Sequence, residues 1–462
     1  MMFSIGKLLS TDLTICTNNM KEIKLHTNHK QFLKRTNTHL FIILLLMVAC
    51  FFTWSENILI TRIIKVVGRM SVLFASYWVY RKIIKYGAVD TLKWHNSQVI
   101  FLYMAYLILG FASFMWSTNV GYSALQWLMT SQTLVFCYFF VKSLYLLDAY
   151  FPEHPVKLYN LLGNTAAALL LVFVIGMWVA PTVFYRMTHG GAEARLGGYL
   201  MNPNELGMLC CIGIAGLLFN FYEKKNMGWT ILKLLVLFYA LYATGSRSSL
   251  IGVFLIIGYH IKQSSSKNLK IGALAALLMI MPLAVNKIIL KDGDSSRLEE
   301  VMSMTGRLPF WKALISEGIP REPLLGFGFM RIDYKEYFQS THTYPGKMTH
   351  NTFMQALMNL GFIGLTIVIF QVVFTFQAVS KENKGKRLML WSMIIPILIN
   401  SFTEFGIFGE SNYGILFYQL IILYISFKAS SILTPKQKIY LQKRRPELFS
   451  ESGLKIPSTF HK

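Results

Sequence analysis

The chain has 462 residues, of which 54% are hydrophobic and only 15% are charged. Soluble globular domains carry about 25% charged residues, so a water-soluble enzyme is excluded and a membrane protein is indicated. The net charge of +23 would suit nucleic-acid binding only if the basic residues formed one folded face. They fall instead in short clusters between apolar stretches, so we expect no nucleic-acid partner.

The first 39 residues are polar and mildly basic. No apolar run directly follows the initiator, so this stretch does not resemble a cleaved signal peptide. The cysteines lie in this stretch or inside apolar runs, which predicts no disulfide framework, and none has zinc-ligand spacing.

Because a bilayer core needs about 20 apolar residues per helix, the remaining sequence divides into candidate transmembrane spans. The sequence predicts an all-α fold, a polytopic transmembrane helical bundle with about twelve spans. The spans are placed at 40–57, 60–80, 98–115, 124–146, 158–180, 204–222, 228–244, 248–261, 270–288, 351–379, 388–405 and 412–430.

The basic residues orient this bundle. With a cytoplasmic N-terminus, the inner segments and adjoining helix ends hold 29 Lys and Arg, and the short outer segments hold three. This bias predicts cytoplasmic termini, with membrane lipid around the bundle. The predicted organisation is a cytoplasmic basic N-terminal segment (1–39), spans one to nine (40–288), an extracytoplasmic helical loop domain (289–350), spans ten to twelve (351–430) and a cytoplasmic basic tail (431–462).

The second span carries Arg62, Lys65 and Arg69 on one helical face. Charged residues in a span can line a transport cavity, which would favour a flippase or another transporter. A tilted helix with basic residues at the membrane interface is the interpretation that we prefer.

Two arginines lie in short outer segments. Arg195 opens a glycine-rich stretch that turns at Asn202-Pro203, where Asn202 suits a helix cap and Pro203 a first helical turn. Arg247 lies in the very short turn 244–249, and a charge at membrane depth costs about 2.5–3.5 kcal/mol, so it normally faces a cavity or a partner. Contact with lipid headgroups is the alternative for both side chains.

The long outer segment before span ten contains a short helical pattern. Leu308, Trp311 and Ile315 recur at helical spacing, with Pro309 in the first turn and Arg307 at the start. We therefore expect a short amphipathic helix across the mouth of the bundle, packed through these apolar residues.

His350 is the last outer residue before the span that starts at 351. The positive end of a helix dipole disfavours an imidazolium, so a neutral ring that can accept a proton is expected there. A purely structural histidine is the alternative. The catalytic interpretation depends on Arg195, Arg247 and Arg307 converging on the same outer cavity.

These residues together favour one kind of chemistry. Guanidinium groups bind phosphate oxygens bidentately, and the sequence shows no acidic metal box beside them, so we expect a diphosphate clamp with neither a metal nor another cofactor. A neutral histidine nearby would act as a general base on a hydroxyl group. The combination fits displacement of a lipid-linked diphosphate from a sugar by a sugar hydroxyl.

The same residues form a pattern that resembles the O-antigen ligase and polysaccharide polymerase superfamily. The matching elements, in chain order, are Arg195…Asn202-Pro203-Asn204, Thr244-Gly245-Ser246-Arg247-Ser248, Gly306-Arg307…Trp311…Pro323-Leu324-Leu325-Gly326-Phe327-Gly328 and His350-Asn351…Gly361-Phe362-Ile363-Gly364. The resemblance covers about residues 160–370. It implies a metal-independent, multi-pass glycosyltransferase of the bacterial plasma (inner) membrane that acts in cell-surface polysaccharide (O-antigen or exopolysaccharide) biosynthesis.

The resemblance also implies the substrates and the roles of the site residues. The donor would be an undecaprenyl-diphosphate-linked glycan, with Arg195, Arg247 and Arg307 binding its diphosphate and His350 acting in catalysis. The acceptor would be another lipid-linked glycan in a repeat-unit polymerase, which the motif form favours, or lipid A core in a ligase. A lipid-linked oligosaccharide flippase is the non-enzymatic alternative, but it has no evident use for an outer loop that ends in His350.

Overall fold

The structure is a computed structural model. It describes residues 30–151, 156–188, 193–223, 226–264, 266–268, 270–272, 275, 278, 307–329, 349–404, 406–409, 411–429, 435–444, 449–450 and 453–454.

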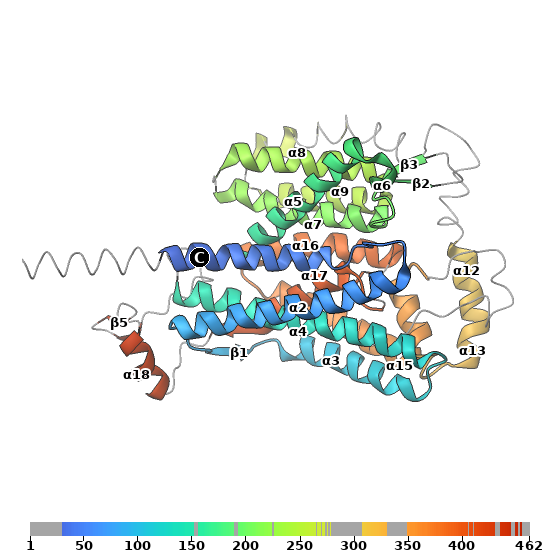
Figure 1. The fold of residues 1–462 in the computed structure, drawn as a ribbon, viewed down its shortest axis with the longest axis horizontal. Helices are drawn as coiled ribbons and strands as arrows, with labels where there is room; N and C mark the ends of the chain where they lie inside the picture. Colours follow the sequence, from blue (N-terminus) through green and yellow to red (C-terminus); the bar gives the residue numbers. More distant parts are fainter. Residues whose placement is uncertain are drawn as a thin grey trace, which may run out of the picture.

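The fold is an all-α helical bundle, as predicted, whose long helices run nearly parallel to one another (Figure 1). The long helices are an unlabelled first helix at Lys30–Ala49, α2 (Ile58–Tyr86), α3 (Ser97–Ala112, continued by the 3-10 turn Ser113–Met115), α4 (Val120–Tyr150), α5 (Leu158–Val179), α7 (Pro203–Glu223), α8 (Met227–Thr244), α9 (Arg247–Gln263), α15 (Thr352–Ser380), α16 (Lys384–Thr403) and α17 (Tyr413–Ser426). Two short helices, α6 (Pro181–Phe184) and α18 (Pro435–Arg444), lie outside this set.

Two groups of helices meet at α16. Helices α5, α7, α8 and α9 pack on one another, and α16 packs against both α7 and α9. Helices α2, α3, α4, α15 and α17 form the other group, which α16 contacts through α15 and α17. The end of α16 therefore lies where both groups can contribute side chains.

Among the described residues, seven helices are long and apolar enough to cross a membrane by length and composition. They are the first helix, α3 with its 3-10 turn, α4, α5, α7, α8 and α15. Each of the predicted spans except the ninth coincides with a helix of the structure, and most of the ninth, 270–288, lies outside the described residues. The first helix is already present at Lys30, where the described residues begin and ten residues before the predicted boundary, and Phe32 and Leu33 pack into the core.

Short strand pairs join segments that are distant in sequence. Strand β1 (Leu92–Trp94) pairs antiparallel with β4 (Phe427–Ala429), so the α2–α3 connection lies beside the residues that follow α17. Strands β2 (Tyr185–Thr188) and β3 (Glu193–Leu196) form a hairpin between α6 and α7, and β5 (Phe449–Ser450) pairs with β6 (Gly453–Leu454).

A short helical unit crosses one end of the bundle. It consists of α12 (Arg307–Ala313), a π-helical turn (Leu314–Gly318) and α13 (Ile319–Arg321), and Figure 1 shows it nearly perpendicular to the long helices. The helix was predicted, but its packing face was predicted wrongly. Leu308 and Ile315 are exposed, whereas Phe310 and Leu314 are buried.

The buried face of this unit packs on α15. Phe310 and Leu314 cluster with Phe327, Leu357 and Met358, while Trp311 is only partly buried. Phe310 and Leu314 are four positions apart and therefore share one helical face. The π-helical turn, which winds more residues per turn than an α-helix, alters the spacing only from Leu314 onward.

The segment after α13 is held against a kink in α15. Leu360 and Gly361 depart from helical geometry, and Gly361 has a φ of 63°. The amide of Phe362 donates to the Pro323 carbonyl (2.8 Å), and the amide of Phe327 donates to the Met358 carbonyl (2.9 Å). A Cβ atom on Gly361 would lie 2.2 Å from the Leu324 carbonyl carbon, so only glycine fits this contact.

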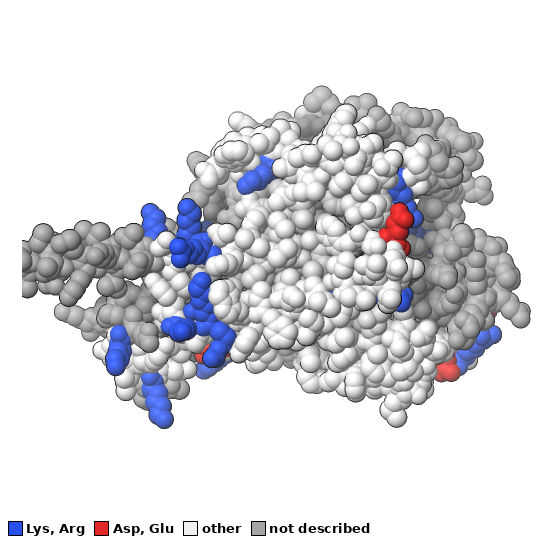
Figure 2. All heavy atoms as spheres, in the orientation of Figure 1, with Lys and Arg blue, Asp and Glu red and all other residues white. Residues whose placement is uncertain are grey.

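The two ends of the bundle differ in charge. Figure 2 shows most Lys and Arg side chains gathered at the end that holds β1 and α18 in Figure 1, while the broad middle surface carries almost none. The crossing helices α12 and α13 and the β2–β3 hairpin lie at the opposite end.

Candidate active site

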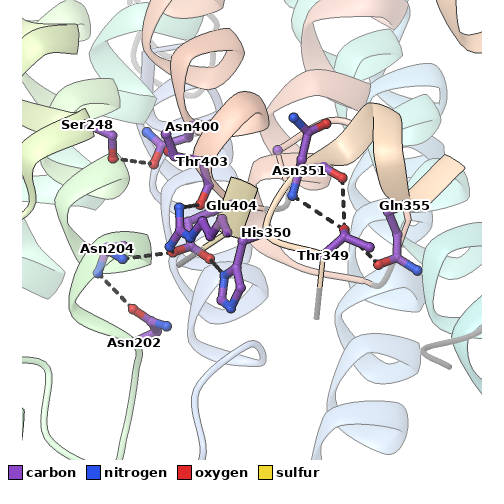
Figure 3. A network of polar contacts seen from close by, with 12 residues as sticks. Asn202, Asn204, Ser248, Thr349, His350, Asn351, Gln355, Asn400, Thr403 and Glu404 are labelled. Carbon is purple, nitrogen blue, oxygen red and sulfur yellow. Dashed lines mark hydrogen bonds and ion pairs between the residues drawn. The ribbon is translucent and has the colours of Figure 1, made fainter. Parts of the chain in front are cut away.

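A buried carboxylate, Glu404, joins several elements at the end of the bundle that carries α12. Glu404 directly follows the last residue of α16 and its side chain is 8% exposed. Its Oε1 accepts from Asn204 Nδ2 (2.8 Å) and from Arg307 Nη2 (3.1 Å), and its Oε2 contacts His350 Nδ1 (2.7 Å). Figure 3 shows Glu404 between Asn204 and His350.

Arg195 reaches this carboxylate through one intermediate residue. Its Nε donates to the Thr244 carbonyl (2.7 Å) and its Nη2 donates to Asn204 Oδ1 (2.7 Å), so Asn204 bridges Arg195 and Glu404. As predicted, α7 begins at Pro203, and Asn202 Oδ1 accepts from the Asn204 amide (2.9 Å). This cap fixes the backbone that presents Asn204 to both charges.

A tight turn brings Arg195 to this position. Arg195 lies in β3, and Gly198 has a φ of 62° in the turn that follows. A Cβ atom on Gly198 would lie 1.7 Å from the Val183 carbonyl oxygen, so the close approach to α6 requires glycine.

Arg247 lies at the same end of the bundle. It is the first residue of α9 and is half-buried, after a two-residue turn in which Gly245 adopts the left-handed conformation. Before this turn, the Thr244 carbonyl accepts the hydrogen bond from Arg195. After it, Ser248 Oγ donates to Asn400 Oδ1 of α16 (3.3 Å). The residues on either side of Arg247 therefore contact Arg195 and α16, the helix that Glu404 follows.

Arg307 contacts the end of α16 directly. Its Nη1 donates to the Thr403 carbonyl and its Nη2 forms an ion pair with Glu404 (3.1 Å). Its Nε is buried and has no hydrogen-bond partner within the described part of the chain. The Nε–H group of Arg307 is thus left without an acceptor among the described residues.

His350 is held in an uncommon backbone conformation. Its φ is 49°, and the next residue, Asn351, caps α15 by accepting from the amides of Phe353 and Met354. On the other side, the Thr349 carbonyl accepts from Trp311 Nε1 (2.6 Å). Left-handed φ values are rare outside glycine and cluster at functional sites, so the surrounding contacts must hold His350 in place.

The contact with Glu404 defines the roles of the two imidazole nitrogens. An ionised carboxylate can only accept, so Nδ1 must donate its proton to Oε2. In a neutral ring, Nε2 is then the nitrogen that can accept a proton. The sequence argument invoked the α15 dipole for a neutral ring, whereas the structure adds a carboxylate that orients the ring.

Glu404 stays ionised in spite of its burial. Burial alone would raise the pKa of this carboxyl group. The charge that His350 carries when it is protonated, its hydrogen bond, the charge of Arg307 and the hydrogen bond from Asn204 outweigh burial and lower the pKa below its ordinary value. At neutral pH an ionised acceptor therefore faces His350.

The sequence analysis missed Glu404. It lies inside the apolar run predicted as span eleven, where an acidic residue is costly and usually has a partner. That cost was the available signal, but the partners are 54, 97 and 200 positions away in the chain. Within the described residues, no group of three His, Cys, Asp or Glu side chains could hold a metal ion.

The structure thus joins Arg195, Arg307 and His350 through Asn204 and Glu404, and it places Arg247 beside the same elements. Residues 232–369 match the family model described as O-antigen ligase, and no curated protein matches the chain. The matched segment contains Arg247, Arg307 and His350. This match supports the resemblance to the O-antigen ligase-related superfamily that the sequence motifs predicted.

Proposed function

We propose that the protein is a glycosyltransferase that moves a glycan from a lipid diphosphate, of the undecaprenyl type, to the hydroxyl group of an acceptor sugar. The observation that carries this proposal is the His350–Glu404 contact of 2.7 Å, set among elements that bear three arginines. A carboxylate that orients a histidine and stabilises its imidazolium form supports general-base catalysis.

His350 would act on the acceptor. Its Nε2 takes the proton of the acceptor hydroxyl as the oxygen attacks the anomeric carbon of the donor sugar. Glu404 accepts the Nδ1 hydrogen bond throughout and stabilises the imidazolium that forms. One glycosidic bond forms, and the bond between the anomeric carbon and the diphosphate oxygen breaks.

The arginines would act on the leaving group. The departing lipid diphosphate keeps the electron pair of the broken bond, and positive charge aimed at it lowers the barrier. Arg307 has an unpartnered Nε, Arg195 lies one residue from Glu404 through Asn204, and Arg247 begins α9 beside them. We assign the diphosphate to these three side chains, which requires no other cofactor.

Two enzymes fit this proposal, and they differ only in the acceptor that they use. We favour a repeat-unit polymerase, in which a second lipid-linked glycan is the acceptor, because the sequence motifs resemble polymerases of exopolysaccharide and O-antigen more closely. The family description favours an O-antigen ligase, in which lipid A core is the acceptor. A flippase would not need a carboxylate that orients a histidine.

The direct test incubates the purified protein with a lipid-linked repeat unit alone, and then with lipid A core added. A ladder of products without core supports the polymerase, and product only after core is added supports the ligase. No transfer in either reaction would contradict the enzyme assignment.

The charge distribution supports one orientation in the membrane. We propose an inner-membrane location with the basic end (Figure 2), which holds β1 and α18, in the cytoplasm. Glu404 and His350 would then face the opposite compartment. Labelling of single cysteines in the connections at each end, with a reagent that does not cross membranes, tests this orientation.

A further inference from the structure

A second group of cations lines a separate pocket between α2 and α4. Its volume is about 350 Å³, within the range of small-molecule sites. The side chains that carry the argument are Arg62, Lys65, Arg69, Gln126, Tyr199 and Ser411. The sequence analysis preferred an interfacial position for the three cations, but the structure places them around one cavity, the alternative ranked second.

Arg69 is the buried member of this group. It is 1% exposed, its Nη1 donates to Ser411 Oγ (2.7 Å), and its guanidinium carbon lies 3.9 Å from the centroid of the Phe51 ring. Its Nε has no hydrogen-bond partner, and no carboxylate pairs with it among the described residues. Burying a charge without a counter-charge is costly, so an anion is the missing partner.

The neighbouring charges add to this cost. Arg62 and Lys65 lie seven and four positions before Arg69 on the same face of α2, and all three side chains line the pocket. Among the described residues, the lining contains three basic side chains and one acidic side chain, Glu56. Three basic side chains around one cavity create a positive potential that attracts an anion.

This basic pocket shares two connecting segments with the Glu404 site. Tyr199, which lines the pocket, lies between Arg195 and Asn204 in the turn before α7. Ser411, which holds Arg69, follows Glu404 in the connection between α16 and α17. An anion bound in this pocket would therefore lie at the same end of the bundle as the reacting groups.

We propose that the basic pocket binds the phosphate or diphosphate headgroup of a second lipid-linked glycan, which is the acceptor. This identification rests on the proposed function, in which Arg195, Arg247 and Arg307 already hold the donor diphosphate. Transfer between two lipid-linked glycans brings two anionic headgroups to one end of the protein. Because these headgroups repel each other, each needs its own set of cations.

A binding experiment tests the pocket without turnover. Native mass spectrometry of the full chain with undecaprenyl diphosphate as the probe is expected to show two bound molecules. The double variant Arg62→Gln/Lys65→Gln removes two charges but no fully buried group, and it should weaken the second binding event at least about tenfold. The control is Arg81→Gln/Lys85→Gln, at the opposite end of α2, which should still bind two molecules.

Two results would overturn this assignment. One is retention of two probe molecules at unchanged affinity by Arg62→Gln/Lys65→Gln. The other is equal displacement of the second probe by phosphatidylglycerol, which would make the pocket a general phospholipid site. The expected result is that phosphatidylglycerol does not displace the probe.

A kinetic experiment separates this proposal from the proposed function. In the elongation assay, Arg62→Gln/Lys65→Gln should raise the half-saturating acceptor concentration at least about tenfold and leave hydrolysis of the donor by water unchanged. An unchanged half-saturating concentration would contradict the acceptor site. His350→Asn should lose transfer but still bind two probe molecules, so a failure of catalysis and a failure of this pocket give different results.

Discussion

His350 and Glu404 are 54 positions apart in the sequence, yet imidazole Nδ1 lies 2.7 Å from carboxylate Oε2. The first precedes α15 and the second follows α16, so the packing of these helices sets the contact. The relationship gives the carboxylate a role in orienting the proposed base, and that role can be tested without removing the histidine.

Glu404→Gln keeps the size of the side chain and removes its charge. The amide no longer requires Nδ1 to donate and no longer stabilises an imidazolium, so the transfer rate should fall by about 10²–10⁴-fold. Initial rates of product formation measure this. Glu382→Gln is the matched control, since Glu382 pairs with Lys386 away from the site, and a comparable loss there would contradict the assignment.

His350→Ala and His350→Asn should both abolish glycan transfer and leave membrane insertion intact. The two differ in backbone cost, because asparagine tolerates the φ of 49° better than alanine does. Expression and thermal stability of His350→Asn should therefore stay close to those of the unmodified protein. Normal product from the asparagine variant would remove His350 from the mechanism.

Arg247→Ala should abolish transfer, and Arg247→Lys should fail as well because a point charge does not reproduce the bidentate fork on a diphosphate. Arg186→Ala is the control, since Arg186 is an exposed arginine of the β2–β3 hairpin. Product yield from a lipid-linked donor measures the effect. Full activity of the lysine variant would mean that Arg247 contributes only charge.

Stability should depend on pH through Glu404, whose folded-state pKa lies below its ordinary value of 4.5. A lowered carboxyl pKa contributes stability that is complete above the ordinary value and is lost as the pH falls through the folded-state value. The melting temperature in detergent should therefore decline in acid. Glu404→Gln should show a smaller decline, and identical acid profiles of the two proteins would exclude this contribution.

Gly361→Ala should destabilise the protein by about 1–3 kcal/mol or more, because the residue has a left-handed φ and faces the Leu324 carbonyl. It should also reduce transfer, since the 323–328 segment ties the Arg307 helix to α15. Gly258→Ala is the control because a Cβ atom there meets nothing within 4 Å. Thermal unfolding measures both variants, and equal melting temperatures would contradict the expectation.

The sequence predicted the helices well and the carboxylate at the site not at all. Apolar runs are local signals, so α4, α5 and α15 appear close to their expected positions. Arg195, Arg247, Arg307 and His350 were predicted to converge. The structure connects Arg195, Arg307 and His350 through Asn204 and Glu404, and it places Arg247 beside the same elements. Glu404 itself carries no local pattern, because its partners come from three other parts of the chain.

The error on the crossing helix has a different cause. Ile315 lies in the π-helical turn Leu314–Gly318, whereas Leu308 lies in α12, on a different face from the buried Phe310 and Leu314. A departure of this kind depends on the surface against which the segment packs. The position of α12 was therefore predictable, whereas its orientation was not.

The amide of Asn204 gives its bridge a fixed direction. Its oxygen accepts from the Arg195 cation and its nitrogen donates to the Glu404 anion. A half-turn of the amide plane would place donor against donor at Arg195 and acceptor against acceptor at Glu404. One planar group thus distinguishes the side of the site that receives negative charge from the side that handles protons. An aspartate at position 204 would remove this direction, because its carboxylate cannot donate to Glu404 and would repel it.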